Sequence, residues 1–192
     1  MNDKMNYQRG FELILVYFKK AFSKQTNNMK TLLLIRHAKS GWDDPSLADF
    51  DRNLTERGKS DAKMMAKRIK EQSIDIDSFV SSPAKRAKKT AKIFIKEFKK
   101  DEEEMLLTPD LYEGSVSDFY TTIENLEDIK NVVAVFAHNP GITEFINSLQ
   151  CSPVYNMPTC AVFALKINTN DWKNFREADK QFLFFDYPKN VD

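Results

Sequence analysis

The sequence predicts a three-layer α/β/α fold with a mainly parallel central sheet. Short apolar runs, typical of buried strands, alternate with longer segments whose apolar residues recur at i, i+3, i+4 and i+7, the spacing of an amphipathic helix. Two of the apolar runs, residues 32–35 and 132–137, stop just before a histidine. Because open α/β sheets bind ligands at the carboxyl ends of their strands, these two endings also predict a functional site.

The first half of the chain carries signals for two strands, two helices and a long loop. In chain order we expect a strand at 32–35, a loop at 41–53, a helix at 55–71, a strand at 74–80 and a helix at 83–99. Thr55 is a suitable N-cap for the first helix. Ser82 is expected to cap the second helix, with Pro83 in its first turn. Arg86 then lies in that first turn, near the end of the first strand.

The second half is expected to contain two helices and three strands. In chain order these are an extended segment ending at 111–114, a helix at 115–126, a strand at 131–137, a helix at 139–149, and strands at 160–167 and 182–185. Ser115 and Asp118 have the spacing of a capping box. Asn139 and Pro140 open the later helix, so His138 is expected beside a helix N-terminus, which favours anions.

The composition is that of a single domain without the charge of a nucleic-acid-binding protein. A chain of 192 residues with 42% hydrophobic residues can build one sizeable core. Its 29 basic and 28 acidic residues give a net charge of +1, which argues against nucleic acid as a partner. Cys151 and Cys160 are too few for a disulfide framework, so we expect reduced cysteines and a cytoplasmic protein.

Residues 1–28 are expected to be an extension outside the fold, and residues 29–192 to form the domain. The apolar stretch at 11–18 is shorter than the roughly 20 residues that a membrane span needs, and Lys19 and Lys20 end it. No convincing signal-peptide cleavage site follows it. We therefore expect no membrane span and a fold that begins near residue 29.

Two arginines and both histidines of the chain are expected at one edge of the sheet, namely Arg36, His37, Arg86 and His138. Two permanent cations disfavour a metal ion, so we expect no metal and no cofactor. Arginine matches phosphate oxygens in bidentate geometry, and phosphoryl transfer needs those oxygens neutralised. Nearby cations favour the neutral form of a histidine, which can attack phosphorus. The set therefore predicts phosphoryl transfer.

Three motifs follow one another in the chain: Arg36-His37, then Ser82-Pro83 with Arg86-Ala87-Lys88-Lys89-Thr90-Ala91, and finally His138. In this order they resemble the histidine phosphatase superfamily, which has the phosphoglycerate mutase-like fold, over residues 29–188. Within that superfamily, residues 36–42, 51–58 and 138–141 are similar to the SixA type of phosphohistidine phosphatase.

The resemblance implies a mechanism in which His37 attacks the phosphoryl group and becomes phosphohistidine, which water then hydrolyses. Arg36, Arg86 and His138 would hold the phosphoryl oxygens, and Asn139 joins them as an expected substrate-binding residue. The implied substrate is phosphohistidine in a protein, such as a histidine-containing phosphotransfer domain.

A proton donor is the open question of the predicted site. Larger members of the superfamily place an acid after a Leu-x-Glu segment, which 111–113 matches. The SixA branch often lacks this acid, as expected if the leaving group is an imidazole on a labile N–P bond. Glu113 is therefore either the proton donor or an ordinary loop carboxylate. Asp44 and Asp49 are weaker candidates, since such residues are usually plain turn residues.

Two other functions remain open. The first is a small-molecule phosphomonoester phosphatase of the same fold, whose alkoxide leaving group would need the proton of Glu113. The second is a non-catalytic regulator that binds a phosphorylated anion, although binding alone would not require a nucleophile. A mutase is less favoured, because the connections after Leu111 look too short to enclose a substrate.

Overall fold

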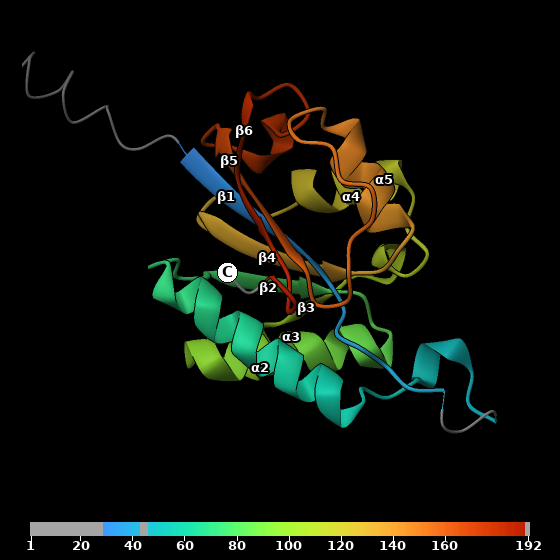
Figure 1. Cartoon of the computed structure of the whole chain (residues 1–192). Helices are drawn as coiled ribbons and strands as arrows, with labels where there is room; N and C mark the ends of the chain where they lie inside the picture. The colour runs from blue at the N-terminus through green and yellow to red at the C-terminus, as the bar shows by residue number, and fades with distance from the viewer. Residues whose placement is uncertain (1–28, 43–45, 191–192) are drawn as a thin grey trace, which may run out of the picture.

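The computed structural model describes residues 29–42 and 46–190, which form a six-stranded sheet between layers of helices (Figure 1). The strands are β1 (Met29–Arg36), β2 (Ser78–Ser81), β3 (Leu106–Leu107), β4 (Val132–Ala137), β5 (Val162–Asn168) and β6 (Lys180–Asp186). The α-helices are α2 (Glu56–Glu71), α3 (Lys85–Phe98), α4 (Val116–Glu124) and α5 (Gly141–Ser148). The sheet order is β3-β2-β4-β1-β5-β6.

The sheet is mainly parallel, which confirms the predicted fold class. β1 pairs in parallel with β4, β4 with β2, and β2 with β3, whereas β5 and β6 are antiparallel. In the β1–β4 register, Arg36 lies opposite Ala137. Because the two strands run side by side in the same direction, His37 and His138 leave the sheet at the same end.

Alternate residues of β1 face two separate halves of the core. Leu32 and Leu34 pack in the cluster that includes residues of α4 and α5, whereas Leu33 and Ile35 pack in the cluster that includes residues of α2 and α3. Figure 1 shows these two helix pairs on opposite sides of the sheet. A central strand that is covered on both faces must be apolar throughout, which explains the uninterrupted apolar run in the sequence.

The predicted helix starts at Thr55 and Ser115 are confirmed, and the one at Ser82 is wrong. The Thr55 hydroxyl caps α2 by accepting from the amide of Gly58 at 3.0 Å, and Ser115 forms a capping box on α4. No side chain caps α3, which begins only at Lys85. Ser82 is fully buried at the end of β2, where its hydroxyl bonds His138 and accepts from the amide of Ala84 at 3.3 Å, ahead of the helix.

The structure shifts two other predicted elements. β2 begins at Ser78 rather than near residue 74, and a 3-10 turn at Pro109–Leu111 stands where an extended segment is predicted. The sequence does not predict β3, because two half-exposed residues are too few to show a strand pattern. The expected extension at 1–28 lies outside the described residues. In the part that is described, no helix has both the length and the apolar character needed to cross a membrane.

Two glycines allow loops to press against the end of the sheet. A Cβ atom added to Gly58 would lie 2.1 Å from the carbonyl oxygen of Lys39, and one added to Gly141 would lie 2.0 Å from that of Gly114. Both distances are far inside van der Waals contact with backbone atoms. Only glycine therefore lets α2 approach the loop after His37, and lets α5 approach the loop around Gly114.

Candidate active site

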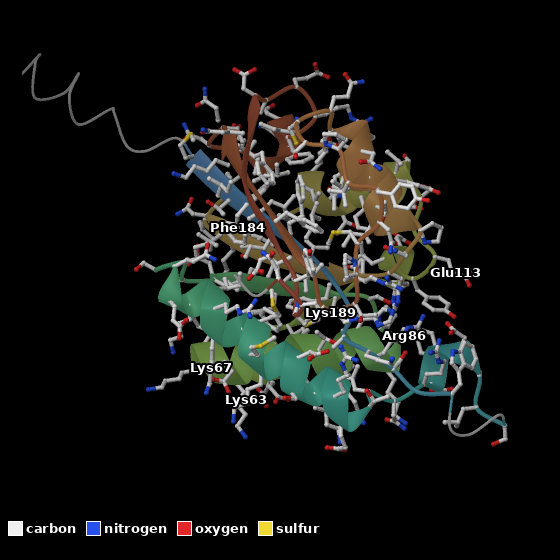
Figure 2. The ribbon with its side chains drawn as sticks, in the orientation of Figure 1. Lys63, Lys67, Arg86, Glu113, Phe184 and Lys189 are labelled. Carbon is white, nitrogen blue, oxygen red and sulfur yellow. The ribbon has the colours of Figure 1, made fainter. Side chains whose placement is uncertain are left out.

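One pocket lies at the carboxyl ends of β1 and β4. It has a volume of about 880 Å³, and its lining includes every predicted site residue, namely Arg36, His37, Arg86, Glu113, His138 and Asn139. The rings of His37 and His138 lie 5.0 Å apart between centroids. Figure 2 shows Arg86 and Glu113 on the same side of the molecule, toward the carboxyl end of β1, whereas Lys63 and Lys67 extend from α2 into solvent.

The contacts of His37 select one tautomer of its ring. Nδ1 lies 2.8 Å from the carbonyl oxygen of Ala38, which can only accept, so Nδ1 carries the proton. Nε–H of Arg86 donates to His37 Nε2 over 3.2 Å, and arginine cannot accept. The lone pair of the neutral ring is therefore on Nε2, beside the Arg86 guanidinium.

Both histidines are neutral at ordinary pH. Burial is the main cause that lowers the pKa of His37 to about 3; the Ala38 hydrogen bond opposes the shift, and the charges of Arg86 and Arg36 add to it. Burial likewise lowers the pKa of His138 to about 3, with further contributions from His37 and Arg86. A neutral imidazole has the lone pair that a nucleophile requires.

We expect neither imidazole to gain a proton between about pH 8 and about pH 5, although an ordinary histidine titrates near pH ~6.5. Each pKa is depressed in the folded state, so protonation requires a pH well below this range. The chain contains only two histidines, so NMR spectra of ¹⁵N-labelled protein can follow each ring, and His138→Gln assigns the signals. A midpoint near pH ~6.5 for His37 would contradict a buried neutral ring.

His138 is bonded on one side and unpartnered on the other. Its Nε2 lies 2.8 Å from the hydroxyl oxygen of Ser82. Its Nδ1 is buried and has no hydrogen-bond partner among the described residues. Tyr112 packs edge-on against the ring, with 5.6 Å between centroids. A buried polar atom without a partner is rare in folded proteins, so Nδ1 is available to a polar ligand.

Arg36, the last residue of β1, also has, within the described part of the chain, one nitrogen that is hydrogen-bonded and one that is not. One Nη1–H donates to the carbonyl oxygen of Met157 over 2.6 Å, while Nε is buried with no hydrogen-bond partner in the described ranges. Burial and the nearby Arg86 lower the pKa of Arg36, but a guanidinium stays charged in proteins. Arg36 therefore brings a fixed cation and an unused donor to the pocket.

Arg86 is bound to Asp49, which the sequence ranks only as a weak candidate. Nη1 donates to the Asp49 carbonyl oxygen over 2.6 Å and Nη2 to its carboxylate over 2.8 Å. Burial raises the pKa of Asp49, but hydrogen bonds from Arg52 and Tyr112 and the charge of Arg86 outweigh it and lower the pKa to about 2. Asp49 is therefore an ionised carboxylate at the site. Asp44 lies outside the described residues.

Ser82, Arg52 and Tyr112 also reach the site, and sequence reasoning did not place them there. Ser82 bonds His138 across 56 positions of chain, and Tyr112 bonds Asp49 across 63. Serine before proline suits a helix start, and an arginine or tyrosine in a loop suits many roles. Ser82 and Tyr112 bond partners in distant elements, and Arg52 bonds Asp49 three positions away in a loop, so helix and strand patterns give these residues no site role.

Glu113 and Asn139 line the pocket at its rim. Glu113 is exposed and has a positive φ of 57°. The Asn139 side chain accepts a hydrogen bond from Thr143 at 2.9 Å and donates to the Met157 carbonyl oxygen at 3.3 Å, the same oxygen that binds Arg36. This amide thus supports the loop that holds Arg36. Proton donation by Glu113 and substrate binding by Asn139 stay predictions.

Comparison with known sequences identifies the family. A family model described as histidine phosphatase superfamily (branch 1) matches residues 32–150. The chain is 34% identical over 91 residues to the 2,3-bisphosphoglycerate-dependent phosphoglycerate mutase of Bartonella henselae, covering 46% of this chain and 44% of the mutase. It is 28% identical over 167 residues to an uncharacterised chloroplastic protein of Arabidopsis thaliana, covering 80% of this chain and 73% of that protein. The chain thus spans less than half of the mutase's length.

Solved structures show the same fold. The putative phosphohistidine phosphatase SixA from Agrobacterium tumefaciens superposes with a TM-score of 0.70 at 21% identity, covering 83% of this chain and 98% of that one. A protein histidine phosphatase SixA complexed with tungstate gives a TM-score of 0.71 at 20% identity, covering 84% and 99%. The matched family model and this shared fold agree, and the chain belongs to the histidine phosphatase superfamily (branch 1).

Proposed function

We propose that this protein is a phosphatase that removes the phosphoryl group from phosphohistidine in a partner protein, such as a histidine-containing phosphotransfer domain. In the first step, the hydrogen bond from Arg86 to Nε2 of His37 breaks, and the freed lone pair of Nε2 attacks phosphorus. The new P–N bond forms as the bond to the substrate imidazole breaks, and the leaving imidazole takes up a proton from solvent, which the attacking water returns in the second step. In the second step, water attacks phosphorus, the bond to Nε2 breaks, and inorganic phosphate leaves.

The observation that carries this proposal is the Nε2 lone pair of His37 beside the Arg86 guanidinium. The charge of a loose phosphoryl-transfer transition state is spread over its equatorial oxygens, which positioned cations stabilise. Arg36 and Arg86 supply fixed N–H donors for those oxygens, and His138 supplies the unpartnered Nδ1. A SixA structure of the same fold is a complex with tungstate, an oxyanion like phosphate, which supports an oxyanion as a ligand.

The position of Glu113 favours phosphohistidine over a phosphate ester as substrate. An imidazole leaves readily from a labile N–P bond, whereas an alkoxide leaving group needs a positioned acid. Glu113 is exposed, whereas both histidines are buried. A small-molecule phosphomonoester phosphatase is the second candidate, supported by the presence of Glu113 in the pocket lining and by the mutase relative.

The substitution Glu113→Gln distinguishes the two proposed activities. We expect phosphate release from a phosphohistidine protein to change by less than about 3-fold, and release from an alkyl phosphate to fall by about 10²-fold if Glu113 is a general acid. The measurement is phosphate release from both substrates at matched enzyme concentration.

Glu144→Gln is the matched control, because it removes the same charge from another carboxylate of the same pocket. Equal effects of the two changes on the ester would indicate a general electrostatic effect rather than proton donation. If the wild-type protein prefers the ester and Glu113→Gln abolishes that activity, the phosphohistidine proposal is wrong. Turnover of neither substrate would favour the non-catalytic anion-binding regulator.

A further inference from the structure

The carboxylate of Asp49 binds the guanidinium of Arg86 at the wall of the pocket. Nη2 of Arg86 donates to Oδ2 over 2.8 Å, and Nη1 donates to the Asp49 backbone carbonyl over 2.6 Å. Arg86 is only 6% exposed, and a buried charge is costly unless it is paired and hydrogen-bonded. Asp49 pairs with the buried charge of Arg86. It belongs to the 3-10 turn Asp49–Asp51, which lies between β1 and α2.

Other donors hold the Asp49 carboxylate in place. Arg52 donates to Oδ1 over 2.9 Å, and the Tyr112 hydroxyl donates to Oδ2 over 3.0 Å. Arg52 in turn donates to the carbonyl oxygen of Gly41 at 3.0 Å and lies 3.5 Å from the ring centroid of Trp42. The carboxylate therefore joins Arg86 to a network that spans the loop after β1 and the loop before α4.

This anchoring determines where the rest of the guanidinium points. The group is planar and rigid, with five N–H donors in fixed directions, so bonding both terminal nitrogens to Asp49 sets the direction of Nε–H. That Nε–H points at Nε2 of His37, 3.2 Å away. Each terminal nitrogen keeps one N–H that Asp49 does not use, which a phosphoryl oxygen could accept.

We propose that Asp49 is a positioning residue for phosphoryl transfer: it orients Arg86 so that the guanidinium faces both Nε2 of His37 and the oxygens of a phosphoryl group bonded there. This inference rests on the proposed function, because it requires His37 to receive the phosphoryl group. It also accounts for an ionised carboxylate in a pocket suited to an anion, since the charge of Asp49 is neutralised by Arg86 and Arg52.

The first test is a double-mutant cycle on phosphate release from a phosphohistidine protein. Asp49→Ala should lower kcat by about 10-fold or more, within the roughly 10²-fold that a misplacement of about 1 Å can cost. In the Arg86→Ala background, the same change should lower kcat by less than about 2-fold, because Asp49 acts through Arg86. Asp51 is an exposed residue of the same turn, so Asp51→Ala is the matched control and should leave kcat unchanged. Equal losses in both backgrounds would overturn the proposal.

The second test does not depend on turnover. The ¹⁵N chemical shift of His37 Nε2 reports the hydrogen bond from Arg86, and Asp49→Ala should move it toward its value in Arg86→Ala. The milder Asp49→Asn should move it part of the way, and Asp51→Ala should not move it. An unmoved shift in both Asp49 variants would overturn the positioning role, whereas absent turnover in the wild-type protein would overturn the proposed function.

Discussion

Replacing His37 with alanine is expected to lower phosphate release by about 10⁴-fold or more, the scale of losing a catalytic nucleophile. The remaining arginines can still bind a phosphorylated substrate, but no nitrogen lone pair remains at the position of Nε2 to form the P–N bond. The measurement is single-turnover phosphate release, with the mass of the phosphoenzyme recorded before and after acid treatment. Wild-type protein should accumulate an acid-labile phosphoenzyme, and His37→Ala should not.

His138→Ala is the informative comparison. This variant loses the unpartnered Nδ1 but keeps the Nε2 lone pair of His37, so we expect slower turnover with the phosphoenzyme still formed. A phosphoenzyme in His37→Ala would show that another side chain is the nucleophile. If the phosphoenzyme forms in His37→Ala but not in His138→Ala, then His138 is the nucleophile and His37 is not.

Replacing Arg86 with alanine is expected to lower phosphate release by about 10³-fold, the lower part of the range that a phosphoryl-binding arginine contributes to kcat. The change removes the cation beside His37 Nε2 and leaves the Asp49 carboxylate without that partner in an anion pocket. The measurement is kcat for phosphate release from a phosphohistidine protein.

Arg86→Lys keeps the charge but lacks the rigid fork, so we expect a smaller loss that still exceeds about 10-fold. Lys96→Ala is the control, because it removes a positive charge from the exposed face of the same helix and should have no effect on kcat. A wild-type rate in Arg86→Ala would contradict an Arg86 contact with the transferred group. Equal rates in Arg86→Lys and wild type would show that charge alone is needed.

The strand endings that place the histidines could be predicted because they depend on local pattern. A fully buried strand needs consecutive apolar residues, and β1 and β4 show such runs up to the residue where the sheet ends. Parallel pairing then brings His37 and His138 to one edge without any further information. Thr55 and Ser115 were predictable for the same reason, since a helix cap bonds an amide only three residues along the chain.

The role of Ser82 shows where local reasoning fails. Serine followed by proline satisfies the local rules for a helix start, yet the Ser82 hydroxyl bonds both His138 and the amide of Ala84, and no helix begins at Pro83. α3 consequently begins at Lys85 without a side-chain cap, and Arg86 still lies in its first turn. The hydroxyl thus bonds a nearby amide and a distant ring nitrogen together, and only the nearby bond is of the kind that local sequence predicts.

The sequence by itself therefore determined the fold class, the two strand ends that carry the histidines, and the family, because these follow from periodicity and from the order of short motifs. Only the tertiary structure decided which nitrogen of His37 has the lone pair, and that Asp49 is the carboxylate bound to Arg86. The physical reason is that both depend on hydrogen bonds between distant elements. Such bonds depend on where the folded chain places a loop, which no local pattern encodes.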